Sequence, residues 1–146
     1  MLKDQNYEPE HKLLLRNLKI SDYDDMVEVM TATYPDIEEH WSYKQIKKLI
    51  RIFPEGQICI EDKEKVIAFV LSIIIDYSKF GDDHAFEEIL GNYEFDTHDP
   101  NGDVLYGIEV IVHPEYRNMR LGRRLYDARK DLCEQLNLKA IIAGGR

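Results

Sequence analysis

The stretch VLYGIEVIVHPEYRNMRLGRRLYDARKDLCEQLNLKAIIA, residues 104–143, decides the fold that the sequence predicts. Its first nine residues, 104–112, are mostly apolar and often β-branched, which predicts a strand. Leucines then recur at helical spacing over 121–136, and Asn137 is a residue type that tolerates the left-handed conformation after a helix. The apolar run 138–143 predicts another strand. Strand, helix and strand in this order predict a βαβ unit, whose two strands are parallel.

The residues before this unit predict the rest of a mixed sheet with helices beside it. A leucine-rich run over 12–20 predicts a first strand, and apolar residues at helical spacing predict two helices, over 21–34 and 42–53. Each helix begins at a serine that is followed three residues later by Asp or Gln, the pattern of a capping box. Residues 57–61 and 66–75 predict a hairpin, and the unbroken apolar run of its second strand predicts burial on both faces.

The composition is that of a single soluble domain. The chain has 146 residues, 44% of them hydrophobic, and its longest apolar run, 66–75, is far shorter than the roughly 20 residues of a membrane helix. The 28 acidic and 19 basic residues give a net charge of -9, which disfavours binding to nucleic acid or to an anionic membrane. The chain starts without the apolar segment of a signal peptide, and its two cysteines lie far apart. We therefore expect a cytoplasmic domain without a disulfide or a metal site.

Residues 116–130, YRNMRLGRRLYDARK, concentrate basic side chains in an acidic chain. They join the end of a strand to the start of a helix, where unpaired N–H groups and the helix dipole attract an anion. Gly122 lets the backbone approach such an anion closely. A phosphate or pyrophosphate is the natural ligand, although the charges alone are equally compatible with solvated arginines that offset nearby carboxylates.

The run VHPEYRNMRLGRRL, residues 112–125, resembles the acetyl-CoA loop of GNAT-type N-acetyltransferases, in which a strand ends in V-x-P and R/Q-x-x-G-x-G/A precedes a helix. The order of the other elements is also similar to that family. The resemblance implies an α/β (α+β) fold with a GNAT-type mixed central sheet flanked by helices and a βαβ acyl-CoA-binding unit. It also implies that residues 1–146 form one domain that lacks the C-terminal part of the usual fold, a helix and two strands.

The resemblance implies an acetyl-CoA site at the end of the central strand. In the family, the strand backbone pairs with the pantetheine arm and thioester, and amides of the loop hold the pyrophosphate. Carried over to this chain, the cofactor-binding residues are Val110, Ile111, Val112, Arg117, Asn118, Arg120, Leu121, Gly122 and Arg123. Arg120 stands where the family has its first motif glycine. A positive φ there would carry a steric cost, whereas a helical φ would place a further cation beside the phosphates.

Direct transfer of an acetyl group to an amine requires a base, and the resemblance implies a carboxylate on the central strand beside the thioester. Glu109 is the sole candidate in that strand and is our predicted catalytic residue; alternatively, its side chain faces solvent or pairs with an arginine of the following helix. A strand amide near Val112 would stabilise the oxyanion. The acceptor would be a small-molecule or peptide amine, and the acidic stretch 81–103 favours a cationic one. Trp41 and two nearby tyrosines either line an acceptor groove or pack in the core.

The sequence around the arginine-rich helix and the final residues AGGR are also similar to the acetyltransferase-like N-terminal module of some carbon–nitrogen hydrolase (nitrilase-like) fusion proteins. This narrower resemblance implies that another domain follows in a longer protein. It leaves an alternative to catalysis open, namely a non-catalytic acyl-CoA-binding or structural module of a larger enzyme. An incomplete sheet would expose an edge and apolar surface, so we expect either a covalently following domain or a homodimer.

Overall fold

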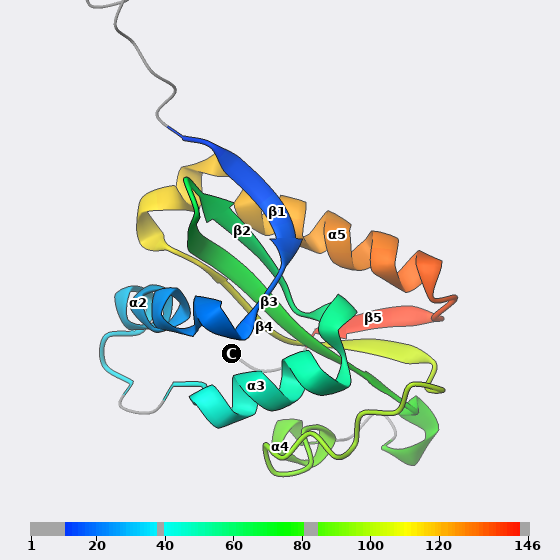
Figure 1. The fold of residues 1–146 in the computed structure, drawn as a ribbon. Helices are drawn as coiled ribbons and strands as arrows, with labels where there is room; N and C mark the ends of the chain where they lie inside the picture. The colour runs from blue at the N-terminus through cyan, green and yellow to red at the C-terminus, as the bar shows by residue number, and fades with distance from the viewer. Residues whose placement is uncertain (1–10, 38–39, 81–84, 144–146) are drawn as a thin grey trace, which may run out of the picture.

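The computed structural model describes residues 11–37, 40–80 and 85–143, and it contains one five-stranded sheet with helices on both faces (Figure 1). The strands are β1 (Leu13–Asn17), β2 (Ile58–Asp62), β3 (Lys65–Ile75), β4 (Val104–Val112) and β5 (Ala140–Ala143). The helices are α2 (Tyr23–Thr33), α3 (Tyr43–Ile52), α4 (Phe86–Ile89) and α5 (Leu121–Gln135). Short 3-10 turns lie between them, namely η1 (Ile20–Asp22), η2 (Pro54–Gly56), η3 (Tyr77–Lys79) and η4 (Pro114–Met119). The predicted mixed α/β fold is confirmed.

The strands lie in the sheet in the same order as in the chain, β1-β2-β3-β4-β5. Each neighbouring pair up to β4 is antiparallel, whereas β4 and β5 are parallel and are connected through α5. The predicted hairpin and the predicted βαβ unit are both confirmed. Helices α2 and α3 pack on one face of the sheet and α5 packs on the other, so the sheet separates two apolar layers (Figure 1).

Strand β3 contributes side chains to both layers. Its residues from Val66 to Ile75 are all buried, as the unbroken apolar run predicts. Phe69 and Leu71 contact the layer beneath α2 and α3, whereas Ala68 and Val70 contact the layer beneath α5. Because β3 is held on both faces, it forms a fixed support for β4, which pairs with it from end to end.

The two early helices begin in different ways. Helix α3 has the predicted capping box, since the amide of Gln45 donates to Ser42 Oγ at 3.1 Å and the amide of Ser42 donates to Gln45 Oε1 at 2.8 Å. The corresponding box predicted at Ser21 is wrong, because the turn η1 comes first and α2 begins only at Tyr23. There the buried carboxylate of Asp22 accepts the amide of Lys19 at 2.8 Å and makes the turn instead.

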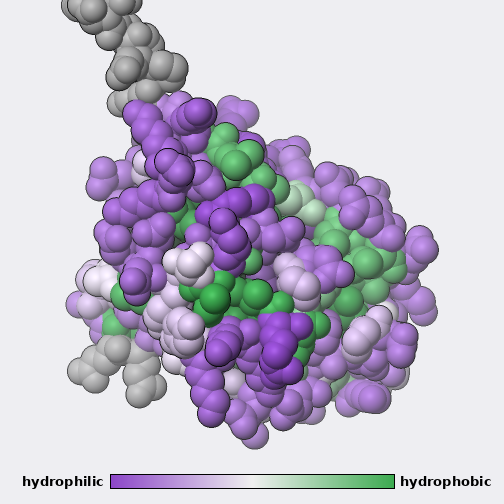
Figure 2. Space-filling model, viewed as in Figure 1, coloured by the Kyte–Doolittle hydropathy of each residue, from purple (hydrophilic) through white to green (hydrophobic). Residues whose placement is uncertain are grey.

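Strand β5 is at one edge of the sheet in the described part of the chain, and its residues are exposed or half-buried. Figure 2, viewed from the same side as Figure 1, shows a mostly hydrophilic surface with several apolar areas, one of which lies where α5 ends and β5 lies. Leu136, which follows α5, is 37% exposed. That a further domain or a second copy covers this edge stays a prediction. Among the described residues, no helix combines the length and the apolar sequence that a membrane span needs.

Candidate functional site

The parallel strands β4 and β5 pair along only half of β4. Strand β5 pairs with residues Val104 to Gly107, whereas β3 pairs with β4 as far as Val112. On the β5 side, residues 108–112 of β4 therefore have no strand beside them among the described residues. The sheet opens at this point, next to the loop that the sequence predicts to bind a cofactor.

Two backbone amides point into this opening. The amide of His113 donates to the carbonyl of Ile67 on β3 at 2.8 Å, and hydrogen-bonded pairs alternate along an antiparallel ladder. It follows that the N–H and C=O groups of Val110 and Val112 point away from β3, toward the open edge, while those of Ile111 point toward β3. The side chain of Val110 is 45% exposed and that of Ile111 only 2%. An extended ligand could therefore pair with β4 at Val110 and Val112.

A bulge in β4 decides where the side chain of Glu109 lies. The register changes between Leu71 and Ser72 of β3, which pair with Glu109 and Gly107, so Ile108 is an extra residue in β4. Ile108 packs in the layer beneath α2 and α3. The carboxylate of Glu109 lies on that same face, where its Oε1 accepts the indole N–H of Trp41 at 2.9 Å.

Glu109 is buried, with 4% of its surface exposed, so the alternative in which its side chain faces solvent does not hold. An arginine of α5 does reach it, since Arg129 Nη2 donates at 2.9 Å, but to the backbone carbonyl of Glu109. Trp41 is also buried and packs against Tyr93 and Phe95, with ring centroids 5.9 and 6.1 Å away. The predicted base thus lies under a layer of aromatic side chains and beside the open edge of its own strand.

The loop after β4 presents amides and cations to solvent. Turn η4 is followed by Arg120, which has φ 58° and ψ 32° and is the N-cap of α5, so the left-handed alternative is the one that the structure adopts. A Cβ added to Gly122 would meet nothing within 4 Å. The side chain of Leu121 is buried beneath α5 and leaves only its backbone for a ligand. The start of α5 can therefore take an anion against its first amides.

The predicted arginines of this loop are exposed. Arg117, Arg120 and Arg123 lie at the surface together with Asn118. Arg123 forms a long pair with Asp127, at 3.6 Å, and both side chains are more than half exposed. Such a pair contributes little to stability, so Arg123 can turn to another anion at small cost.

A hydrogen-bonded network ties this loop to the β2–β3 hairpin. The hydroxyl of Tyr116 donates to Asp62 Oδ2 at 2.5 Å, and the amide of Lys12 donates to Asp62 Oδ1 at 2.7 Å. His11 Nδ1 lies 2.8 Å from the same carboxylate. Burial by itself would raise the pKa of Asp62, but these hydrogen bonds outweigh it and lower the pKa to about 2. Burial and the contact with Asp62 raise the pKa of Tyr116 to about 12.

This network predicts how stability depends on pH. The pKa of Tyr116 is raised from 10.0 to about 12 on folding, so its contribution is complete below pH 10 and is lost as the pH rises to 12. We expect the free energy of unfolding to fall by on the order of 1–2 kcal/mol across this window because of Tyr116. Denaturant unfolding of the wild type and of Tyr116→Phe, measured between pH 10 and pH 12, would isolate this contribution. The other tyrosines titrate in both proteins, so their effect on the free energy of unfolding cancels. If the free energy of unfolding depended on pH in the same way in both proteins, the prediction would be contradicted.

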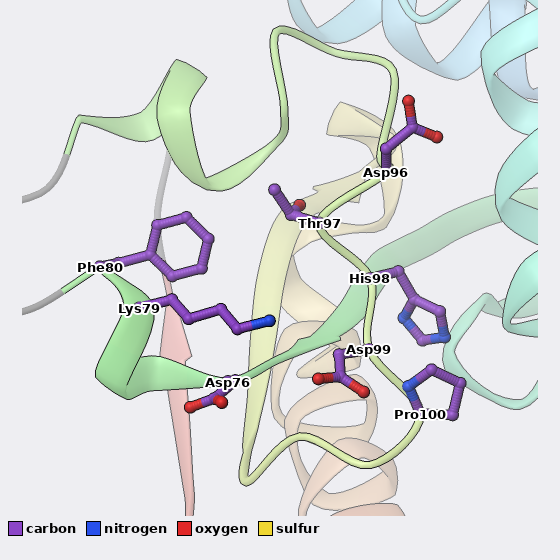
Figure 3. A pocket seen from close by; sticks show the side chains of 8 residues that line it. All are labelled: Asp76, Lys79, Phe80, Asp96, Thr97, His98, Asp99 and Pro100. Atoms are coloured by element: carbon purple, nitrogen blue, oxygen red, sulfur yellow. The ribbon is translucent and has the colours of Figure 1, made fainter.

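A separate cavity of about 360 Å³ lies at the other end of β3 and β4 (Figure 3). It is lined by Asp76, Lys79, Phe80, Asp96, Thr97, His98, Asp99 and Pro100, and Figure 3 shows the side chain of Lys79 extending across it. None of the predicted site residues lines it. His98 is held in its wall, because its Nδ1 accepts the amide of Ile74 at 3.0 Å and its ring stacks on Phe53. Within the described ranges, no three His, Cys, Asp or Glu side chains come together to hold a metal ion.

Sequence reasoning missed the place of Arg129. This side chain is 3% exposed, although the basic stretch predicts arginines that lie in solvent or on a ligand. The sequence does carry a signal for this burial, because Arg129 stands four residues after Leu125 and three before Leu132, on the apolar stripe of α5. The bulge at Ile108 had no signal, because it arises from the pairing of two distant strands.

Known proteins resemble this chain in sequence. Residues 23–145 match the model of the Acetyltransferase (GNAT) family. The chain is 39% identical over 137 residues to "Probable hydrolase YhcX" of Bacillus subtilis (strain 168), and the match covers 94% of this chain and 26% of that protein. It is 26% identical over 137 residues to "Uncharacterized N-acetyltransferase YkwB" of the same organism, covering 92% of this chain and 61% of that protein. The chain thus spans less than two thirds of either relative.

Solved structures share the fold. The loading GNATL domain of CurA from Lyngbya majuscula superposes with a TM-score of 0.75 at 24% identity, over 90% of this chain and 64% of that chain. The GphF GNAT-like decarboxylase, solved in complex with isobutyryl-CoA, gives a TM-score of 0.61 at 18% identity, over 78% of this chain and 55% of that chain. A protein of this fold therefore binds an acyl-CoA.

Proposed function

This chain is a member of the GNAT acetyltransferase family, and from that premise we propose that it transfers an acetyl group from acetyl-CoA directly to an amine. The observation that carries the proposal is the place of Glu109. Its carboxylate is buried on β4, and the same strand leaves its backbone open at Val110 and Val112. A base and a binding edge for a thioester thus lie on adjacent residues of one strand.

Acetyl-CoA would supply a thioester whose carbonyl carbon forms a bond to the amine nitrogen. The carbon–sulfur bond breaks, and coenzyme A leaves as a thiolate that takes up a proton from solvent and is released as the thiol. The open backbone of Val110 and Val112 would hold the pantetheine arm as a further strand holds its neighbour. The amides at the start of α5, from Arg120 to Arg123, would hold the pyrophosphate, and the open space over Gly122 gives it room.

Glu109 would take the proton that the attacking amine must lose. The Val112 amide, which points to the open edge, would donate to the thioester oxygen as negative charge develops there. Trp41 would hold the carboxylate in place through its 2.9 Å hydrogen bond. The acceptor in this proposal is a small-molecule or peptide amine.

A second candidate is a non-catalytic acyl-CoA-binding or structural module of a larger protein. What favours it is the 39% identity to a probable hydrolase of which this chain spans only 26%. In that case the site would bind the acyl-CoA without turnover, and the longer protein, as in a carbon–nitrogen hydrolase fusion, would carry its own chemistry elsewhere.

One experiment separates the two candidates. We would titrate the chain with acetyl-CoA by calorimetry and then follow thiol release with a panel of small-molecule and peptide amines. Catalysis predicts micromolar binding, on the order of -8 kcal/mol, together with thiol release that depends on the amine. Binding without amine-dependent release would favour the non-catalytic module. The absence of binding to a cooperatively folded chain would contradict both catalysis and acyl-CoA binding, and it would favour the structural module.

A further inference from the structure

Arg129 lies against the strand that carries Glu109. Its Nη2 donates to the Glu109 carbonyl at 2.9 Å, and a Cβ added to Gly107 would come within 2.4 Å of its Nη1. The guanidinium therefore contacts β4 on both sides of Ile108, the extra residue of the bulge. Gly107 is the residue that leaves room for this contact.

The bulge determines the face on which the carboxylate lies. In a regular strand successive side chains alternate, so the neighbours Ile108 and Glu109 would point to opposite faces of the sheet. Here Ile108 packs beneath α2 and α3, and Glu109 lies on the same side, bound to Trp41. A regular β4 would turn the side chain that follows Ile108 toward α5 and away from Trp41.

A buried guanidinium at this place calls for a role beyond packing. Arg129 is 3% exposed, and its Nε has no hydrogen-bond partner in the part of the chain that is described. Burial lowers its pKa to about 10, so it still carries a charge near neutral pH. Apolar side chains often fill such positions at lower cost than a buried charge. The carbonyl of Glu109 is the group that Arg129 does bond.

We propose that Arg129 is a positioning residue, which holds the β4 bulge and so keeps the Glu109 carboxylate on the face of the sheet where Trp41 lies. The catalytic consequence rests on the proposed function, because Glu109 acts there as the base. The effect of Arg129 on where the Glu109 side chain lies does not depend on turnover.

The position of the Glu109 side chain can be measured through Trp41, because it is the only tryptophan of the chain. Its indole N–H contacts the Glu109 carboxylate, so its fluorescence reports on that contact. Glu109→Ala supplies the reference spectrum for a lost contact. We expect Arg129→Met to move the emission toward that reference and Arg129→Lys to restore much of the wild-type spectrum. Lys130→Met is the matched control, because it makes the same change of charge at an exposed neighbouring position.

Gly107→Ala tests the same inference while keeping the arginine. The added Cβ would lie 2.4 Å from Nη1 and 2.8 Å from Cζ of Arg129, so the guanidinium must move away. We expect the same spectral change as for Arg129→Met. If Arg129→Met does not fold, Gly107→Ala still shows whether displacing the guanidinium moves the Glu109 side chain away from Trp41.

In the active chain, we expect Arg129→Met to lower kcat by about 10- to 100-fold with the KM for acetyl-CoA nearly unchanged, and Arg129→Lys to recover part of it. A merely structural role would lower stability and leave both kcat and the spectrum of the folded fraction unchanged. Wild-type fluorescence in folded Arg129→Met and Gly107→Ala would overturn the inference. If the wild type shows no turnover, the proposed function fails, while the fluorescence result still decides the place of Glu109.

Discussion

Glu109→Gln is expected to lower kcat for amine acetylation by about 10²- to 10⁴-fold while the affinity for acetyl-CoA stays close to that of the wild type. Glutamine has nearly the same shape, and its Oε1 can still accept the indole N–H that lies 2.9 Å from the wild-type carboxylate. An amide cannot take up the proton of the amine, however. Steady-state thiol release measures kcat, and calorimetry measures the affinity.

The control for this change is Glu134→Gln, the same substitution at an exposed position of α5. It should leave kcat and affinity unchanged. A Glu109→Gln protein with wild-type kcat would show that another group, or water, takes the proton. A large loss of acetyl-CoA affinity would instead mean that the carboxylate shapes the binding edge of β4.

Gly122→Leu is expected to weaken acetyl-CoA binding by about 100-fold, which corresponds to about 2.7 kcal/mol, without weakening the fold. The chain itself leaves the space over Gly122 open, since an added Cβ meets nothing within 4 Å. A leucine can therefore be accommodated in the free protein but would occupy the space that the pyrophosphate needs. Because leucine favours a helix over glycine, the free energy of unfolding should rise, by about 0.5–1 kcal/mol.

The matched control is Gln135→Leu, which adds the same side chain at an exposed position, the last residue of α5. Calorimetry would compare the two affinities, and denaturant melts would compare the two stabilities. Unchanged binding in Gly122→Leu would place the anion elsewhere on the loop. A loss of stability in that variant would mean that the space is needed by the fold.

Local patterns predict most of the fold. The spacing of leucines over 121–136 predicts α5, and the box between Ser42 and Gln45 predicts the start of α3, because both depend on neighbours within a few residues. The predicted start of α2 at Ser21 is wrong. Asp22 also binds Arg16, at 2.9 Å, and that pair makes a different turn before the helix begins at Tyr23.

The candidate site could be predicted only in part. The glutamate on the central strand and the glycine at the start of α5 follow from the motif, and both lie where a ligand could reach the adjacent backbone. The bulge depends on the register between β3 and β4, which no local pattern records. The same holds for the bond between Arg129 and a carbonyl 20 residues away, and for the bond between Tyr116 and Asp62, 54 residues apart.

The sheet order has a consequence for synthesis on the ribosome. Since the spatial order of the strands is the order in which they are made, each new strand finds its neighbour already present. Strand β2 follows α2 and α3 and then pairs with β1, β3 follows β2 through a short hairpin, and β5 pairs in parallel with β4 only after α5 is made. Nascent chains should therefore acquire protease resistance in steps as they lengthen, and the half-open pair of β4 and β5 should form after the four antiparallel strands.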